Sequence, residues 1–193
     1  MAGNLTPNPL RAVEFLHWLN PDAPIYLESM ASQGNAKPIA KRFSPAAITD
    51  AANFVLSRNA DDVQRNMYFL PNAEFLEGER KKANLSAVRL LHVDLDYKDY
   101  PGDEKEQEGR VLALLYDKKA RPKGVPEPTA IWFTGGGCQA VWRLDRPLDV
   151  EQAEELNKAL LIALQGGPGT HNADPLHQGR NGDGHPAHPI GTD

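Results

Sequence analysis

The sequence of 193 residues contains a single cysteine, Cys138, so it can form no internal disulfide and no zinc site built on cysteine pairs. Its longest apolar runs, such as Ala159 to Leu164, are six residues, far below the roughly 20 needed to span a bilayer. The first residues lack the basic start and apolar stretch of a signal peptide. We therefore expect a cytoplasmic protein without contact to a membrane.

The sequence also lacks an excess of positive charge. Its 21 lysine and arginine residues face 26 acidic residues, which gives a net charge of −5 and excludes proteins that hold nucleic acid by bulk charge. It contains no Walker A motif, no G-x-G-x-x-G turn after a strand and no G-x-S-x-G motif, so P-loop, Rossmann and serine-hydrolase sites are unsupported. A nucleic-acid enzyme with a local basic groove stays open.

The residues that are present predict alternating helices and strands. Asn8 and Pro9 have the types that cap and start a helix, and Asp149 with Gln152 has the spacing of a capping box. Helices are expected at 9–19, 45–55, 111–116 and 150–165, the last with Ala153, Leu156, Leu160 and Leu164 on one face. Strands are expected at 24–30, 38–43, 66–70, 89–96, 129–133 and 138–144, with a charged loop at 97–110.

One short segment carries two acids on the same side of a strand. In His92-Val93-Asp94-Leu95-Asp96 the side chains alternate, so Asp94 and Asp96 share one face. Acids at this spacing lie about 7 Å apart at Cβ, and their charges repel unless a cation or basic group neutralises them. Mg²⁺ suits such a pair because it binds few carboxylates and keeps positions for water and phosphate. A strand with one solvated face shows the same alternation, so the pair alone does not identify a metal site.

A glycine turn follows about forty residues later. Thr134-Gly135-Gly136-Gly137 joins two expected strands, and backbone N–H groups in such a turn can face a phosphate. In the second strand, Gln139 and Arg143 share the face opposite Cys138, so they could project from the sheet surface that presents the two acids. A plain hairpin with solvent-facing polar residues is the alternative. Cys138, on the apolar face, is expected to be an inert core thiol.

A basic cluster precedes the glycine turn, and a tail follows the last helix. The cluster consists of Lys118, Lys119, Arg121 and Lys123. These residues are candidates for contact with a DNA backbone, and equally for a solvated helix end where positive charge is favourable. Residues 177–193 are rich in glycine, proline and histidine without hydrophobic periodicity, so we expect a flexible or truncated tail there.

Together these segments resemble the catalytic domain of archaeo-eukaryotic-type primases, the primase-polymerase superfamily, and especially the replication primases of bacterial plasmids and phages. In that family an acid-x-acid pair on a strand precedes a Ser/Thr-Gly-rich turn, a strand with a polar residue and an aromatic, and a third acid. The pair falls on Asp94 and Asp96, the turn and strand on Thr134 to Gln139 with Trp142, and the third acid on Asp174. Gln139 stands where many members have histidine, and the family's Arg-x-Pro-Gly-Thr element is reduced here to His188-Pro-Ile-Gly-Thr192.

The resemblance implies an α+β fold over a catalytic domain of residues 1–176. A mainly antiparallel sheet of the RNA-recognition-motif type, flanked by helices, would carry the three acids, with an N-terminal α/β extension alongside. The implied activity is template-directed nucleotidyl transfer, which makes primers and extends DNA on single-stranded DNA in plasmid or phage replication. Mg²⁺ or Mn²⁺ would be bound by Asp94, Asp96 and Asp174. Thr134, the three glycines, Gln139 and Arg143 would hold the phosphates of a nucleoside triphosphate, and a replicative helicase would be a partner.

Two other functions stay open from the residues themselves. A nuclease or another two-metal phosphoryl-transfer enzyme also uses acids on strands. A non-catalytic module with this fold would bind single strands without metal-dependent activity. Release of pyrophosphate from a nucleoside triphosphate on a single-stranded template separates the three.

Overall fold

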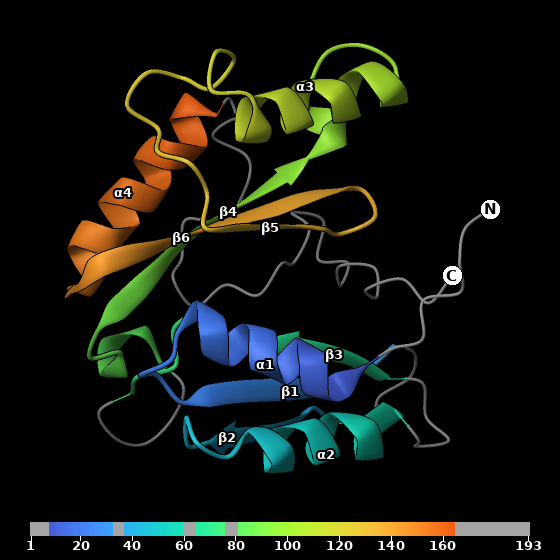
Figure 1. The fold of residues 1–193 in the computed structure, drawn as a ribbon, viewed down its shortest axis with the longest axis vertical. Coiled ribbons are helices and arrows are strands. Elements are labelled where there is room, and N and C mark those ends of the chain that lie inside the picture. The colour runs from blue at the N-terminus through green and yellow to red at the C-terminus, as the bar shows by residue number, and fades with distance from the viewer. Residues whose placement is uncertain (1–7, 33–36, 60–64, 76–80, 165–193) are drawn as a thin grey trace.

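The chain folds into two α/β halves, each built on a three-stranded antiparallel sheet (Figure 1). The computed structural model describes residues 8–32, 37–59, 65–75 and 81–164. The first half contains α1 (Pro9–Leu19), β1 (Ile25–Ala31), β2 (Ile39–Phe43), α2 (Ile48–Asn59) and β3 (Arg65–Phe69). The second contains β4 (Val88–Asp96), α3 (Glu104–Tyr116), β5 (Ala130–Phe133), β6 (Gly137–Leu148) and α4 (Val150–Ala163), with 3₁₀ turns at Lys82–Asn84 and Tyr97–Asp99. The predicted α+β class and antiparallel pairing are confirmed.

The first half is the N-terminal extension, with strand order β2-β1-β3. Asn8 caps α1 by accepting a hydrogen bond from the backbone N–H of Arg11 at 3.0 Å, and Pro9 occupies the first turn, as the sequence predicts. α1 and α2 pack against each other and against this sheet. Val13 from α1 and Leu27 from β1 are buried in the resulting core.

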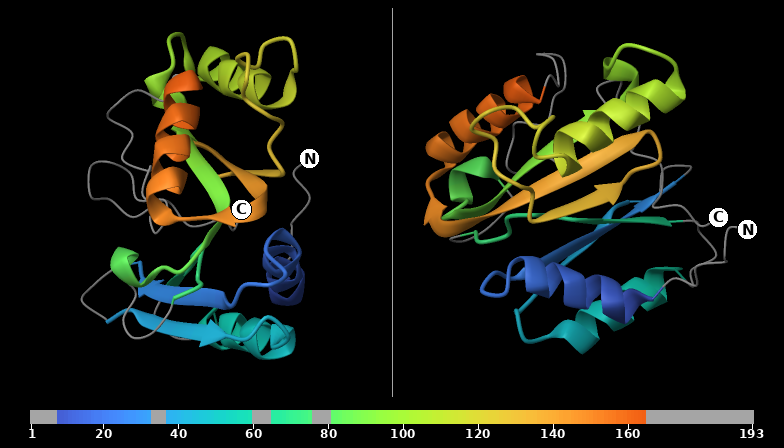
Figure 2. Two further views of the ribbon diagram at one scale, coloured as in Figure 1. Left: turned by 90° about the vertical axis from the view of Figure 1, so that its left-hand side faces the viewer. Right: turned by 45° about the horizontal axis from the view of Figure 1, so that its top comes forward.

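In the second half the strand order is β4-β6-β5, and α3 and α4 lie on the same face of the sheet (Figure 2). The alternation predicted for the two longer strands is confirmed. The face under the helices is apolar, formed by Leu91, Val93 and Leu95 from β4 and by Cys138, Ala140 and Trp142 from β6. Polar side chains are therefore left to the opposite face, which α3 and α4 do not cover.

α3 and α4 differ most from the sequence prediction, and α2 is shifted by three to four residues from the predicted 45–55. α3 begins at Glu104, well before the predicted start at Val111, because Asp103 and Glu106 form a capping box that satisfies the first N–H groups of a charged segment. On α4 the buried side is shifted, since Leu156 is exposed and Asn157 is fully buried. Apolar periodicity alone misplaces this face because one buried position carries an asparagine.

Two buried asparagines complete the outer edge of β4. In the described part of the chain β4 pairs with β6 alone, so its outward backbone groups need other partners. Asn72 accepts hydrogen bonds from the N–H groups of Arg89 and Leu90 at 2.9 and 3.0 Å and donates to the Leu90 carbonyl at 2.9 Å. Asn157 on α4 accepts from the N–H of His92 at 3.1 Å. Side chains from a loop and a helix thus take the place of a neighbouring strand.

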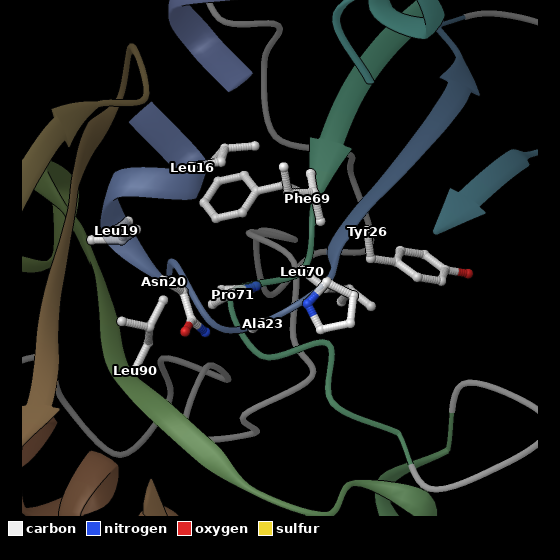
Figure 3. Close-up of a pocket in the computed structure, with 11 residues that line it drawn as sticks. Leu16, Leu19, Asn20, Ala23, Tyr26, Phe69, Leu70, Pro71 and Leu90 are labelled. Atoms are coloured by element: carbon white, nitrogen blue, oxygen red, sulfur yellow. The ribbon is translucent and has the colours of Figure 1, made fainter. Parts of the chain in front are cut away.

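The two halves meet through apolar side chains on the face that α3 and α4 leave open. Leu19 at the end of α1 packs against Leu90 of β4 and Val141 of β6. A pocket at this junction, lined largely by apolar side chains around Asn20, encloses only about 20 Å³, enough for one water molecule (Figure 3). The pocket therefore belongs to the packing between the halves, and the acid pair lies further along β4.

Part of the sequence prediction lies outside the described residues. This part includes Asp174, the expected boundary at residue 176 and the expected tail at 177–193. Among the helices that the structure describes, none is long and apolar enough to cross a membrane.

The first prediction concerns the edge of β4. Asn72→Ala should lower the free energy of unfolding by about 3 kcal/mol, because it leaves two N–H groups and one carbonyl without their hydrogen-bond partner. Asn66→Ala is the matched control, since the Asn66 amide makes only a 3.5 Å contact with the Tyr68 hydroxyl. Urea denaturation followed by circular dichroism measures both, and equal midpoints for the two variants would contradict the assigned role of Asn72.

Candidate active site

Asp94 and Asp96 lie at the end of β4, on the face opposite α3 and α4. Leu95 between them points into the core, so alternation brings both carboxylates to one surface. Their surroundings differ, because Asp94 is 6% exposed whereas the side chain of Asp96 is 20% exposed. The strand thus presents one buried and one more accessible carboxylate side by side.

Gln139 lies directly across from Asp94 in the pairing of β6 with β4. Its Nε2 donates a hydrogen bond to Asp94 Oδ2 at 3.5 Å. This bond is weak, because N–H···O bonds usually measure about 2.7–3.2 Å. The amide is therefore held beside the carboxylate and keeps donor capacity for another ligand.

The surroundings of Asp94 favour the protonated, neutral form of its carboxyl group. Burial raises the pKa of the Asp94 carboxyl from 3.8 to about 6, and the negative charge of Asp96 contributes to the rise. The hydrogen bond from Gln139 lowers the pKa and offsets only part of this effect. A cation held by the two carboxylates would favour their charged forms.

The 3₁₀ turn after β4 adds further charge beside Asp96. Lys98 Nζ lies 3.5 Å from Asp96 Oδ2, but the pair is largely exposed on the lysine side and contributes little to stability. Burial, followed by the charge of Asp96, raises the pKa of Asp99, and Lys98 lowers it. This end of β4 is therefore acidic, with Lys98 as a weak counter-ion that a divalent cation can replace.

The glycine turn is bonded directly to the acid strand. The N–H of Thr134 donates to the carbonyl of Gly137 at 3.0 Å, which closes a two-residue turn of Gly135 and Gly136. Gly135 has a φ of 93°, a conformation that favours glycine. The carbonyl of Gly136 accepts a hydrogen bond from the N–H of Tyr97 at 2.9 Å. The two motifs of the sequence thus meet at one end of the sheet.

The three glycines have different surroundings. Gly135 and Gly136 are exposed, and a Cβ at either position would meet no atom within 4 Å, so a phosphate can approach their backbone. Gly137 is buried, and a Cβ there would collide with the Leu95 carbonyl and lie 3.0 Å from Asp96 Cα. Gly137 is therefore required for the close approach of β6 to β4.

Arg143 lies away from the acid pair. It is four residues beyond Gln139 on β6, about 13 Å along the strand, and it pairs with Leu90. Its Nη1 donates to the backbone carbonyl of Trp18 at 3.0 Å, and its guanidinium lies 5.5 Å from the centre of the Trp18 ring. The structure thus brings Gln139 and the glycine turn to Asp94 but places Arg143 against α1.

The basic cluster lies in the loop that leaves α3, on the side of the sheet that the helices cover (Figures 1 and 2). It comprises Lys118, Lys119, Arg121 and Lys123. Arg121 Nη2 donates to the carbonyl of Leu115 at 2.9 Å and so binds the C-terminal end of α3. The structure therefore separates this cluster from Asp94 by the thickness of the sheet.

Cys138 is a core residue, as the alternation predicts. It is fully buried, and its Sγ lies 3.3 Å from the hydroxyl of Tyr97. Burial raises the pKa of the thiol, and a thiol that stays protonated is a poor nucleophile. Cys138 therefore contributes packing behind the acid strand.

One aromatic residue on the face of the acids, Trp132, is not identified by the sequence patterns. Trp132 on β5 pairs with Gln139, so Asp94, Gln139 and Trp132 form one row across the three strands. Its ring contacts those of Phe15 and Phe69, with centroids 6.2 and 5.7 Å away. Alternation along β5 predicts that Trp132 points to the opposite face from Ile131 and Phe133. Only the pairing of β5 with β6 shows that this is the face that carries the acids.

The pair of aspartates fits a hard divalent cation such as Mg²⁺ or Mn²⁺. Both supply oxygen ligands, and burial together with the charge of Asp96 raises the pKa of Asp94, an effect that a bound cation would oppose. The described residues contain no group of three or more histidine, cysteine, aspartate or glutamate side chains arranged so that it could hold a metal ion. Asp174, the third ligand that the resemblance implies, lies outside the described residues.

The second prediction tests the contact of the two motifs. Gly137→Ala should lower the free energy of unfolding by about 2 kcal/mol, because its methyl group meets backbone atoms of Leu95 and Asp96 that cannot rotate away. Gly136→Ala should change it by less than about 0.5 kcal/mol, since that position is open. Urea denaturation compares the two, and equal effects would show that β6 does not depend on this approach.

The third prediction concerns the charge of Asp94. Because its folded pKa of about 6 lies above 3.8, the folded state binds the proton more tightly, and stability falls as the pH rises from about 4 to above 6. The difference between the two pKa values corresponds to about 3 kcal/mol. Asp94→Asn should therefore unfold with wild-type stability near pH 4 and be up to about 3 kcal/mol more stable at pH 8. Urea titrations in EDTA measure this.

Asp145→Asn is the control for this experiment, because Asp145 is exposed on the same sheet. Its stability should follow the wild type at both pH values. Added Mn²⁺ at pH 8 should raise the melting temperature of the wild type and of Asp145→Asn but not that of Asp94→Asn. An Asp94→Asn variant without a pH-dependent gain would mean that Asp94 is well compensated in the folded state.

Comparison with known proteins gives the fold its name. No protein-family model and no curated protein matches the chain. Three solved structures are similar, each with a TM-score of 0.56. The AEP domain of cyanophage S-2L primase-polymerase is 20% identical, with 87% of this chain and 78% of that chain covered. Primase RepB′ is 16% identical (89% and 49% covered), and the catalytic domain of primase RepB′ in complex with initiator DNA is 15% identical (90% and 76% covered).

At these identities the likeness establishes the fold, and it does so over most of the chain. Both kinds of neighbour, the phage primase-polymerase and the primase RepB′, belong to the superfamily that the acid pair and the glycine turn resemble. The chain therefore has the primase-polymerase fold, as the resemblance of its motifs implied.

Proposed function

We propose that this protein is a template-directed nucleotidyltransferase that makes primers on single-stranded DNA, and extends DNA, in plasmid or phage replication. The observation that carries the proposal is the meeting of the acid pair with the open glycine turn on one face of the sheet. The fold supports it, because its solved neighbours are primases and primase-polymerases, one of them in complex with initiator DNA.

Asp94 and Asp96 would hold Mg²⁺ or Mn²⁺, with Asp174 as a third ligand. A divalent ion, when bound, supplies the positive charge that activates an attacking hydroxyl and neutralises a pyrophosphate leaving group. The burial of Asp94 excludes water from one side of the pair, which strengthens the attraction of its carboxylate for a cation. Asp96, being more exposed, would lie on the side from which substrate enters.

The glycine turn and Gln139 would bind the triphosphate of the incoming nucleotide. A phosphate would be able to reach the exposed backbone of Gly135 and Gly136, and Thr134 would add a hydroxyl at the edge of the turn. Gln139 lies two residues beyond this turn, directly across from Asp94, and has an amide hydrogen to donate to a phosphate oxygen. Positioning the phosphates beside the acids is most of what phosphoryl transfer requires of a protein.

The substrates we propose are a single-stranded DNA template and nucleoside triphosphates. A replicative helicase that opens the duplex is the protein partner that such a reaction needs. The reaction would take place in the cytoplasm, where replicating DNA and nucleotides are found.

The fourth prediction is a primer-synthesis assay on single-stranded DNA with labelled nucleotides and Mg²⁺ or Mn²⁺. Asp94→Asn and Asp96→Asn should each lower nucleotide addition by more than about a hundredfold, because each removes an anionic oxygen from the metal. Gln139→Ala should raise the KM for nucleotide about tenfold and change the metal dependence less, because its bond to Asp94 is long. Gln152→Ala, which changes an exposed glutamine on α4, is the control and should match the wild type.

The products decide between the proposed reaction and its rivals. Pyrophosphate release together with extended strands supports nucleotidyl transfer. Shortened DNA without use of nucleotides would identify a nuclease. Binding of single strands without any metal-dependent product, in the wild type as in Asp94→Asn, would identify a binding module.

A further inference from the structure

An aromatic surface continues from the candidate site along the same face of the second sheet. The row of Asp94 and Gln139 ends at Trp132, whose ring lies edge-on to that of Phe15 on α1. Phe15 in turn stacks on Trp18, with centroids 5.8 Å apart and the two planes inclined by 28°. Side chains from β4, β6, β5 and α1 thus form one continuous path away from the acid pair.

The last part of this path is exposed. Trp18 has 49% and Phe15 has 38% of its surface exposed to solvent. The core of the first half does not need them, because α1 is anchored by other residues, including the fully buried Val13 and Leu19. Two large aromatic rings three positions apart on a helix therefore present a flat apolar surface next to the sheet.

A positive charge lies against the same surface. The guanidinium of Arg143 is 5.5 Å from the centre of the Trp18 ring, and its Nη1 donates to the Trp18 carbonyl. Arg143 is exposed, and a guanidinium carries five N–H donors, so it keeps donors for a phosphate oxygen. The one acid on α1, Glu14, is paired with Arg11 at 3.2 Å. An aromatic ring with an adjoining guanidinium matches an unpaired base with its phosphate.

We infer that Trp18, Phe15 and Arg143 form a binding site for single-stranded DNA, in which a base stacks on Trp18 and a phosphate is bound by Arg143. This inference rests on the proposed function, because it makes the surface a continuation of the site at Asp94. Arg143 lies about 13 Å from Gln139 along β6, so the bound base belongs to the strand beyond the reacting nucleotide. Stacking accepts any base, so this site would hold the strand without selecting its sequence.

The experiment measures binding of a fluorescent oligo(dT) to the full chain by anisotropy, without metal ions or nucleotides. Trp18→Ala should weaken binding about tenfold, and Trp18→Phe, which keeps a stacking ring, should weaken it by less than about threefold. Arg143→Gln should weaken binding and reduce the slope of log K against log salt by about 0.7, because one phosphate contact is lost. Melting curves of all variants establish that they are folded.

Two matched controls lie on α3, on the other side of the sheet. Tyr116→Ala removes an aromatic ring that is 60% exposed, and Arg110→Gln removes an exposed guanidinium. Both should bind as the wild type does. The inference is overturned if Trp18→Ala binds normally, if Trp18→Phe binds as weakly as Trp18→Ala, or if Arg143→Gln leaves the salt dependence unchanged. A role of this surface in binding another protein would give the first of these results.

This test is independent of the reaction. If the wild type makes no primers but Trp18→Ala and Arg143→Gln weaken binding as expected, the DNA site stands and the proposed reaction fails. If Asp94→Asn abolishes synthesis while Trp18→Ala binds and extends DNA normally, the reaction stands and the DNA site fails.

Discussion

The close approach of β6 to β4 at Gly137 is the constraint on which the candidate site depends. No side chain fits between this residue and the backbone of Leu95 and Asp96. The approach places Asp96 opposite Gly137 and Asp94 opposite Gln139, and it brings the glycine turn within hydrogen-bond distance of Tyr97. A shift of β4 by one residue along β6 would turn the acids into the core and the leucines to solvent. Burial of the leucine face under α3 and α4 therefore fixes the register.

The two faces of this sheet have separate tasks. The face under α3 and α4 is packed as a hydrophobic core. The stabilisation from this apolar burial offsets the free-energy cost of burying the Asp94 carboxylate on the same strand. The opposite face is shared between polar residues at the end of β4 and an apolar contact with the first half through Leu19. The N-terminal half therefore covers the part of the sheet that the site does not use.

The edge of β4 shows how the fold keeps the acid strand in place without a strand on its outer side in the described residues. Asn72 and Asn157 bind its outward backbone groups from two different elements. Side-chain amides suit this task because each offers both a donor and an acceptor in one plane. The strand that carries Asp94 and Asp96 is thus held from both sides, by β6 and by these amides.

Local patterns in the sequence determined a large part of this protein. The alternation of His92 to Asp96, the caps at Asn8 and Asp149, and the glycine turn all act within a few residues, and the structure contains each of them. Of the capping box predicted for Asp149 and Gln152, the structure contains the hydrogen bond from the Gln152 N–H to the Asp149 side chain. These features depend on backbone geometry and on near neighbours, which a sequence displays directly.

Only the tertiary structure decided what depends on contacts between distant segments. It placed Arg143 against Trp18 instead of the acids, because α1 packs beside β6 and offers a carbonyl to the guanidinium. Asn157 is buried where its side chain accepts a hydrogen bond from the outward N–H of His92 on β4. Trp132 lies in the row of Asp94 because it pairs with Gln139. Such positions follow from register and from the packing of one half on the other, which no short-range pattern encodes.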